Sequence, residues 1–321
     1  MEAEELWKLY VGMLTIRRVE EQIAERYVEQ EMRCPVHLSI GQEATPVAVS
    51  ACLQQSDKIV SAHRSHAHYL AKGGDLVAML GELYGRDIGC ARGKGGSMHL
   101  FDLDAGQVAA VPIVGSSIPI GVGVAWGEKL HNRDTVVAVY FGDGATEEGA
   151  FAEALDFASL HGLQVLFVCE NNLYSVYTPL ETRQSSGRDI CKVAKAHGVA
   201  AFKGDGNDVE EVCRVTRQAL DHMKCNDGPA LIELSTYRWL EHCGPNWDDE
   251  LGYRKPNELQ DWMNTCPVAA VRQKLIDRHG VTDEQLTELD VNILSKIDDA
   301  FAVVKGAAMP SPSELFTDVY A

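Results

Sequence analysis

Long apolar runs and paired cysteines are both missing from this 321-residue sequence. No stretch approaches the roughly 20 apolar residues that a helix needs to cross a bilayer, so we expect no membrane-spanning segment. The chain starts MEAEELWKLY, which is acidic and amphipathic, unlike a secretory signal or a basic transit peptide. The nine cysteines form no C-x-x-C pair, which argues against a disulfide framework or a zinc ribbon. We therefore expect free thiols and a cytoplasmic location.

Basic residues are scarce as well, because 29 lysines and arginines face 47 acidic residues and leave a formal charge of −18. Nucleic-acid binding needs a basic face, so we expect no nucleic-acid partner. An acidic total does not describe a single cleft, where a few cationic groups can still bind an anion. Hydrophobic residues make up 45% of the chain and charged residues 24%, which is typical of a globular domain.

Short apolar runs alternate with amphipathic stretches in the centre of the chain. The runs suited to buried parallel strands are 135–142, 164–170, 199–204 and 229–238, and the helical stretches between them are 147–162, 189–198 and 208–223. This alternation predicts an α/β fold with a doubly wound, mostly parallel sheet flanked by helices. We expect one domain over residues 1–321, with an N-terminal helix at about 4–31 and a helical tail at about 255–321.

The segments before the centre are expected to be shorter and more irregular. Residues 58–73 are typical of a short strand that runs into a polar, histidine-rich turn. Residues 74–85 are expected to form a helix, and the sequence CARGKGGSMHLFD at 90–102 a glycine-rich basic loop.

Asp143 and Asn172 each follow one of the central apolar runs. Successive parallel strands end at the same edge of a sheet, and open α/β sheets bind their ligands there. The helix expected to begin near Thr146 directs its amino end to this edge, and Gly142 and Gly144 let an anion approach the backbone closely. Carboxylate, amide and carbonyl oxygens suit Mg²⁺ or Ca²⁺. The segment therefore predicts a metal–diphosphate site.

Two other phosphate-binding motifs are not matched. A P-loop requires G-x-x-x-x-G-K-[ST], but around Gly93 and Lys94 the first glycine is replaced by Ile88 and the final hydroxyl residue by Gly95. The dinucleotide fingerprint G-x-G-x-x-G is not met by GVGVAWG at 121–127, whose last spacing differs. We interpret that stretch as close helix packing and expect no nicotinamide site.

The segment GDGATEEGAFAEALDFASLHGLQVLFVCENN resembles the GDG…NN motif of thiamine diphosphate enzymes. In detail it is similar to the alpha subunit of the first component of 2-oxo acid dehydrogenase complexes, a group that includes the pyruvate, branched-chain and acetoin dehydrogenases. Further motifs of the family occur on both sides of this segment. In chain order they are HLSIGQEA, HRSHAHYLAKGG, GKGGSMH, PIVGSSIPIGVGVA, YSVYTP and PSELFTDVYA. The resemblance covers most of the chain and implies the diphosphate-binding half of a thiamine diphosphate-binding fold.

The resemblance also implies the residues that bind Mg²⁺ and the cofactor. The Mg²⁺ ligands would be Asp143, the side chain of Asn172 and the backbone carbonyl of Tyr174. Backbone groups of Gly144 and Ala145 would contact the diphosphate.

Two further segments would contact the cofactor. Arg64 falls where the family has a phosphate-binding arginine, and His63 stands beside it where many relatives have tyrosine. Val114 matches the apolar residue on which the bent cofactor rests. Pro112 replaces a glycine of pyruvate-type relatives, which alters a backbone contact to the pyrimidine.

His242 and His66 are the predicted catalytic residues. His242 aligns with the histidine of the family's mobile loop, which contacts the cofactor phosphates and takes part in proton transfer or acyl handling, as suits an imidazole. His66 is expected to line the cofactor channel or to support Arg64. Beyond His242 the chain has Cys243-Gly244-Pro245-Asn246 in place of the family's H-S-x-S-D-P, so phosphorylation control at that loop is not expected.

Other conspicuous side chains are given structural roles. His63, His66 and His68 lack a carboxylate or cysteine at metal-ligand spacing, so no metal cluster is expected from them. His99 is expected to order its loop. The default for the remaining histidines is a surface or core position: His37, His131, His161, His197, His222 and His279. The aromatic residues of the C-terminal part are expected to pack that segment: Trp239, Trp247, Tyr253 and Trp262.

The implied activity needs a second chain. In the family the activating glutamate comes from a beta subunit, and this sequence holds only one sheet's worth of alternating pattern. The resemblance therefore implies a heterotetramer of two alpha and two beta subunits. It would act on a small 2-oxo acid such as pyruvate, or on acetoin, and pass the acyl group to the lipoyl-lysine of an acyltransferase. Two alternatives stay open: a stand-alone thiamine-dependent carbon–carbon ligase or lyase, and a non-catalytic cofactor-binding subunit.

Overall fold

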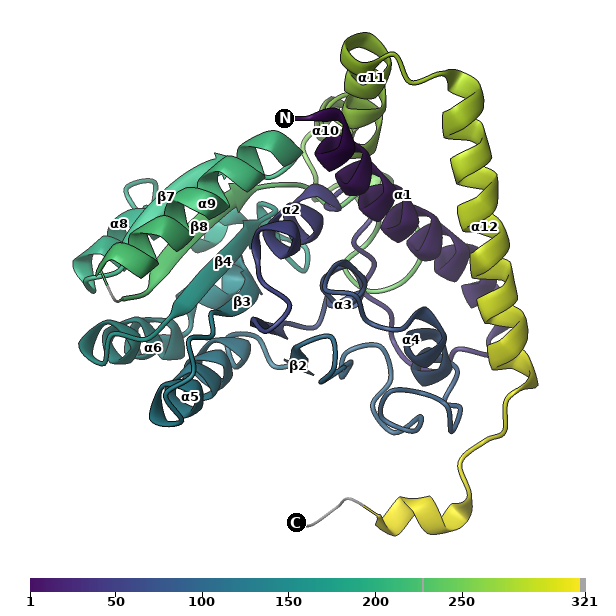
Figure 1. The fold of residues 1–321 in the computed structure, drawn as a ribbon, viewed down its shortest axis with the longest axis horizontal. Coiled ribbons are helices and arrows are strands. Elements are labelled where there is room, and N and C mark those ends of the chain that lie inside the picture. The colour runs from purple at the N-terminus through teal and green to yellow at the C-terminus, as the bar shows by residue number, and fades with distance from the viewer. Residues whose placement is uncertain (227, 318–321) are drawn as a thin grey trace.

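A six-stranded parallel sheet forms the centre of the computed structural model, which describes residues 1–226 and 228–317 (Figure 1). In spatial order the strands are β2 (Gln107–Ala110), β1 (Lys58–Ser61), β3 (Val137–Gly142), β4 (Val165–Asn171), β8 (Ala230–Ser235) and β7 (Ala200–Asp205). Every pairing in this sheet is parallel. The predicted α/β fold with a doubly wound parallel sheet is thus confirmed.

Helices cover both faces of the sheet. One face carries α5 (Ser117–Leu130), α6 (Gly149–Leu160) and α8 (Ile190–Ala196), and the other carries α1 (Ala3–Arg26), α2 (Ala44–Cys52), α3 (His66–Ala71) and α9 (Val209–Asn226). Alternate residues of β3 enter the two cores, since Val139 packs with the first layer and Tyr140 with the second. This two-sided burial is why the strand is a continuous apolar run rather than an alternating one.

The C-terminal part is helical and lies on the outside of the molecule (Figure 1). It consists of α10 (Glu258–Met263), α11 (Pro267–His279) and α12 (Asp283–Gly306), followed by the 3₁₀ turn η4 (Pro312–Phe316). Helix α12 packs against α1 and against α4 (Leu76–Leu83). The last residues of the motif PSELFTDVYA, 318–321, lie outside the described residues. No helix in the described part of the chain is long and apolar enough to cross a bilayer.

Short elements complete the chain around the sheet edge. They are η1 (Tyr27–Glu29), η2 (Asp143–Glu147), β5 (Tyr174–Ser175), β6 (Thr178–Pro179), α7 (Leu180–Arg183) and η3 (Asp249–Leu251). Strands β5 and β6 pair as a small antiparallel ribbon directly after β4.

Four local expectations differ from the structure. The histidine-rich turn after β1 is the short helix α3, because its contacts with α1 and α2 bury His66, His68 and Tyr69. The helix expected near Thr146 begins at Gly149, since the turn η2 intervenes. The N-terminal helix ends at Arg26 rather than near residue 31. Strand β2 was not predicted, because four residues with a half-exposed middle carry too weak a pattern.

Candidate functional site

The ends of three neighbouring strands supply residues to one pocket at the carboxyl edge of the sheet. Ala62, His63 and Arg64 follow β1, Asp143 follows β3 and Asn172 follows β4, and all of them line the pocket. Strands β1 and β3 are neighbours although β2 lies between them in the sequence, because β2 is added on one side of β1 and β3 on the other, so the order of the strands reverses at this point. Open α/β sheets bind ligands at such a switch point.

The pocket brings together all of the residues predicted to bind a metal or cofactor. Its lining includes His63, Arg64, Val114, Asp143, Gly144, Ala145, Asn172, Tyr174 and His242. Of the two predicted catalytic residues, His242 lines the pocket, whereas His66 does not line it and is fully buried. The His66 Nδ1 lies 3.2 Å from a carboxylate oxygen of Glu20, and its Nε2 lies 2.7 Å from the hydroxyl oxygen of Ser97. These contacts favour a supporting role, and catalysis by His66 stays a prediction.

Asp143 presents an unpaired oxygen to this region. Its side chain is 1% exposed, Oδ2 forms an ion pair with Arg183, and Oδ1 has no hydrogen-bond partner among the described residues. Burial raises the pKa of the carboxyl group, and the hydrogen bond from Arg183 opposes this shift. The Oδ1 of Asn172 lies nearby in the lining and accepts a 3.3 Å hydrogen bond from the Tyr174 N–H. A buried oxygen without a partner fits a cation ligand.

The backbone of Gly144 lies close to the side chain of Ser175. A Cβ atom there would lie 2.8 Å from Oγ of Ser175, which is shorter than real contacts of this kind. Turn η2 is closed by Thr146, whose hydroxyl donates a 2.7 Å hydrogen bond to the carbonyl of Asp143. A side chain at position 144 would therefore collide with Ser175, so the turn requires glycine where its backbone lines the pocket.

Arg64 places a buried positive charge in the pocket. Its guanidinium donates to the carbonyl of Leu38 at 2.7 Å and to the carbonyl of His242 at 3.1 Å. Burial lowers the pKa of Arg64 to about 10, and the charge of Arg238 acts in the same direction. The guanidinium is still protonated at neutral pH, so this end of the pocket attracts anions.

Three imidazole rings gather beside Arg64. The ring centroids of His37, His63 and His242 are separated by 4.7, 5.1 and 5.2 Å. Burial, followed by the charge of Arg64, lowers the pKa of His37 to about 2 and the pKa values of His63 and His242 to about 3. His37 was expected to be an ordinary surface or core histidine, and its part in the cluster was missed. Its place at the start of the motif HLSIGQEA was the signal that could have found it.

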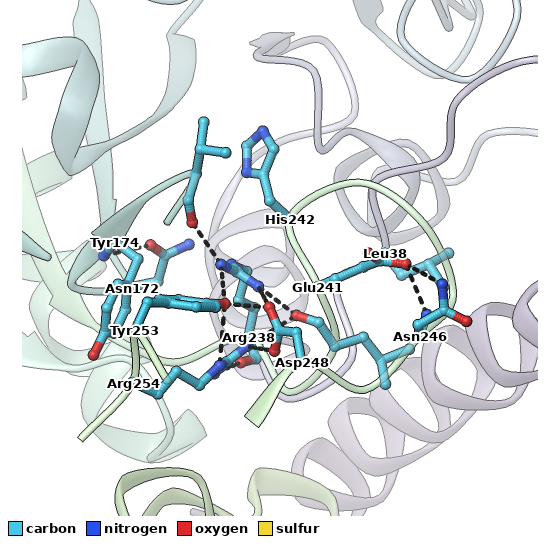
Figure 2. Close-up of polar contacts among 12 residues, drawn as sticks. Leu38, Asn172, Tyr174, Arg238, Glu241, His242, Asn246, Asp248, Tyr253 and Arg254 are labelled. Carbon is cyan, nitrogen blue, oxygen red and sulfur yellow. Dashed lines mark hydrogen bonds and ion pairs between the residues drawn. The ribbon is translucent and has the colours of Figure 1, made fainter. Parts of the chain in front are cut away.

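The loop that carries His242 is anchored by a buried ionic cluster (Figure 2). Asp248 forms ion pairs with Arg238 at 3.1 Å and with Arg254 at 2.6 Å, and it accepts a hydrogen bond from the hydroxyl of Tyr253. Arg238 also donates a 2.7 Å hydrogen bond to the carbonyl of Val176, next to the pocket. Sequence reasoning missed this cluster, since it assigned Tyr253 to packing alone and gave the other three no role.

The tip of the same loop is closed by a clamp (Figure 2). The Glu241 N–H donates to the carbonyl of Asn246 at 2.9 Å, and the Glu241 carboxylate accepts from the Asn246 side-chain amide at 2.7 Å. Gly244 has a φ of +126°, and its N–H donates to the carbonyl of Val36 at 2.8 Å. The segment after His242 that departs from the family pattern is thus a compact turn tied to the residues before His37.

The glycine-rich loop at 90–102 lies apart from the pocket lining. The buried carboxylate of Glu82 accepts hydrogen bonds from four of its backbone N–H groups, those of Ala91, Gly93, Gly95 and Gly96, at 2.6–2.9 Å. His99 contacts the carbonyl of Gly95 through Nδ1 at 2.7 Å, which agrees with its expected role in ordering the loop. Glu82 organises this loop, and its position within an apolar helix gave no hint of that.

The profile of one protein family, described as "Dehydrogenase E1 component", matches residues 11–313. The chain belongs to the dehydrogenase E1 component family. Its curated relatives include a pyruvate dehydrogenase E1 component subunit alpha of Rickettsia felis, 34% identical over 317 residues that cover 99% of this chain and 96% of the relative. The family membership confirms the resemblance to E1 alpha subunits found in the sequence.

Two further relatives give the same result. The subunit alpha of Rhizobium meliloti is 32% identical over 313 residues, which cover 97% of this E1 chain and 89% of the relative. The mitochondrial subunit alpha-1 of Oryza sativa subsp. japonica is 37% identical over 317 residues, which cover 98% of this chain and 80% of the relative. Both carry the name pyruvate dehydrogenase E1 component.

Proposed function

We propose that this E1 chain is the alpha subunit of a thiamine diphosphate-dependent dehydrogenase acting on a 2-oxo acid of the pyruvate type or on acetoin. The observation that carries the proposal is the meeting of two buried groups in one pocket. Asp143 offers an oxygen without a partner among the described residues, and Arg64 offers a cation for an anionic ligand. The names of the relatives support the pyruvate type.

The residues present fit Mg²⁺ and a diphosphate. Asp143, the side chain of Asn172 and the carbonyl of Tyr174 would hold Mg²⁺, because hard oxygen ligands are the ones this ion prefers. The diphosphate would lie against the backbone of Gly144 and Ala145. Arg64, His63 and His242 line the pocket with groups that can donate hydrogen bonds to phosphate oxygens.

Bound thiamine diphosphate supplies a nucleophilic carbon and an electron sink for cleaving the bond next to the carbonyl group of the substrate. The chain's own residues position the cofactor and move protons around it. Val114 lines the pocket and is 45% exposed, so its side chain would pack against the bound cofactor. His242 is neutral at pH 7 in the ligand-free chain, since its pKa lies near 3, so it can accept a proton there once an anion raises that pKa.

The site requires a partner to be complete. Val114 and the neighbouring Ile113, which is 69% exposed, place apolar surface at the mouth of the pocket. We propose that a beta subunit covers this mouth in a heterotetramer of two alpha and two beta subunits. The acyl acceptor would be the lipoyl-lysine of an acyltransferase, which must enter past the loop of His242.

One observation favours a second function, that of a thiamine-dependent carbon–carbon ligase or lyase. The turn Cys243-Gly244-Pro245-Asn246, closed by the Glu241–Asn246 clamp, differs from the family sequence at the entrance that a lipoyl group would use. A non-catalytic cofactor-binding role is less well supported, because Asp143, Asn172 and Arg64 are all in place.

The test is reconstitution of the chain with its beta subunit, Mg²⁺ and thiamine diphosphate. We expect reductive acylation of a lipoyl domain with pyruvate or another small 2-oxo acid, or with acetoin. Asp143→Asn should abolish this activity, whereas Asp104→Asn, at an exposed position, should not change it. Acyloin formation without any lipoyl acylation would reject the dehydrogenase in favour of the ligase.

A further inference from the structure

The cluster of His37, His63 and His242 is surrounded by positive charge rather than by carboxylates. The Nη2 atom of Arg64 lies 3.4 Å from Nδ1 of His242. Arg238, after β8, and His66, in α3, also act on these rings, and both disfavour further positive charge. The carboxylates of Glu20 and Glu170 and the thiol of Cys243 act on Arg64 instead.

The spacing of the three rings would also allow a metal ion. One nitrogen from each ring lies within 4.8 Å of the others. A divalent cation at this point would, however, face the guanidinium of Arg64 with no carboxylate in the group to balance the charge. Neutral imidazoles beside a guanidinium suit an anion, because each ring already donates through one N–H and becomes a cation with a second donor when it gains a proton.

We propose that a diphosphate anion enters this pocket together with a proton, which the cluster of His37, His63 and His242 takes up. The inference rests on the proposed function, because the anion is the diphosphate of the cofactor. His37 is buried and its Nδ1 has no hydrogen-bond partner among the described residues, so a proton there can be shared with the two rings beside it.

The charge balance gives the direction of the effect. In the ligand-free chain all three rings are neutral at pH 7, since burial and Arg64 hold their pKa values at about 2 to 3. A polyanion in contact with the rings reverses the sign of the local field and raises these pKa values. Adjacent imidazolium rings repel each other, so we expect uptake of about one proton per site rather than three.

The measurement is calorimetric titration of the full chain with its beta subunit. Thiamine diphosphate with Mg²⁺ is injected at pH 7.5 in buffers of different ionisation enthalpy, and inorganic pyrophosphate with Mg²⁺ serves as a second probe. The observed enthalpy should depend on the buffer with a slope of about one proton. The dissociation constant should fall by up to about tenfold for each pH unit below 7.5.

Two variants assign the proton to the cluster. His63→Tyr restores the residue that many relatives have, and His37→Gln removes the buried ring. Each should reduce the buffer dependence by at least half, because the proton loses one of its sites. His131→Gln changes an exposed histidine at the end of α5 and is the control. It should bind the probes with the same proton uptake as the unchanged chain. Protons taken up or released by the phosphate groups of the probe are the same in both proteins.

The outcomes separate this inference from the proposed function. Binding of both probes with no buffer dependence would overturn the inference and leave the proposed function standing. Uptake that persists unchanged in both His63→Tyr and His37→Gln would also overturn it. Absence of binding for both probes would overturn the proposed function, and the inference with it.

Discussion

Arg183 pairs with one oxygen of Asp143 and leaves the other free. Its Nη2 atom contacts Oδ2, its Nη1 atom contacts the carboxylate of Glu147, and Oδ1 of Asp143 has no partner among the described residues. Arg183 thereby ties turn η2, after β3, to the segment that follows β4. The pair fixes the orientation of the carboxylate before any ligand arrives.

Replacing Arg183 with glutamine should weaken the binding of Mg²⁺ with thiamine diphosphate. A residue that hydrogen-bonds to a metal-ligating side chain typically contributes about 10–100-fold to metal affinity. We therefore expect the affinity for Mg²⁺ to fall by about that factor. Mg²⁺ titration at saturating thiamine diphosphate, followed by calorimetry, measures the change. Arg214→Gln, on the exposed face of α9, is the control. Tighter binding in Arg183→Gln would mean that the guanidinium repels the metal more than it orients Asp143.

Acid should destabilise the ligand-free protein through the buried histidines. His37, His63 and His242 have folded-state pKa values of about 2 to 3, below the usual 6.5, so the unfolded chain binds more protons between these limits. Stability is therefore greatest above pH 6.5 and is lost as pH falls below it. Melting temperatures from pH 8 to 5 should show this fall, and it should be shallower in His63→Tyr than in His131→Gln. Equal slopes in both variants would contradict the assignment.

Asp248 should be among the most sensitive positions for stability. Asp248→Asn would leave the buried guanidinium groups of Arg238 and Arg254 without their shared carboxylate. Breaking a buried ionic network in this way costs about 3–5 kcal/mol. The adjacent and exposed Asp249→Asn is a matched control that should change the free energy of unfolding in urea by less than about 0.5 kcal/mol. Similar effects of the two variants would show that the network does not stabilise the fold.

Glu82 should control the order of the glycine-rich loop. Glu82→Gln replaces a carboxylate oxygen with an N–H donor that faces backbone N–H groups of residues 91–96, and the lost hydrogen bonds should cost about 2–3 kcal/mol. Amide hydrogen exchange in residues 91–96 should accelerate, whereas Glu31→Gln, at an exposed position, should leave it unchanged. Unaltered exchange in Glu82→Gln would show that the loop is held by other contacts.

The sequence predicted the site residues that directly follow strands of the parallel sheet. Asp143 and Asn172 follow apolar runs, and parallel strands end at one edge, so their meeting needs no knowledge of side-chain packing. The family motifs brought Arg64 and His242 to the same place.

The groups that the sequence missed depend on side-chain contacts that no local pattern encodes. Arg183 stands in a four-residue helix, and nothing in its surroundings indicates a contact with Asp143, 40 positions earlier. Asp248 belongs to the run DDE, which has the composition of a solvent-exposed turn, yet it is 2% exposed because two arginines from elsewhere in the loop enclose it. Burial of charge is a tertiary property that composition does not encode.

The hydrogen bond from Arg238 to Val176 joins two segments 62 positions apart. One of them carries His242, and the other follows the predicted metal ligands Asn172 and Tyr174. Neither segment can move away from the edge of the sheet without breaking the hydrogen bond between Arg238 and Val176. Ligand exchange on the metal side and loop opening on the histidine side should therefore share one rate-limiting motion, with a single time constant in both places.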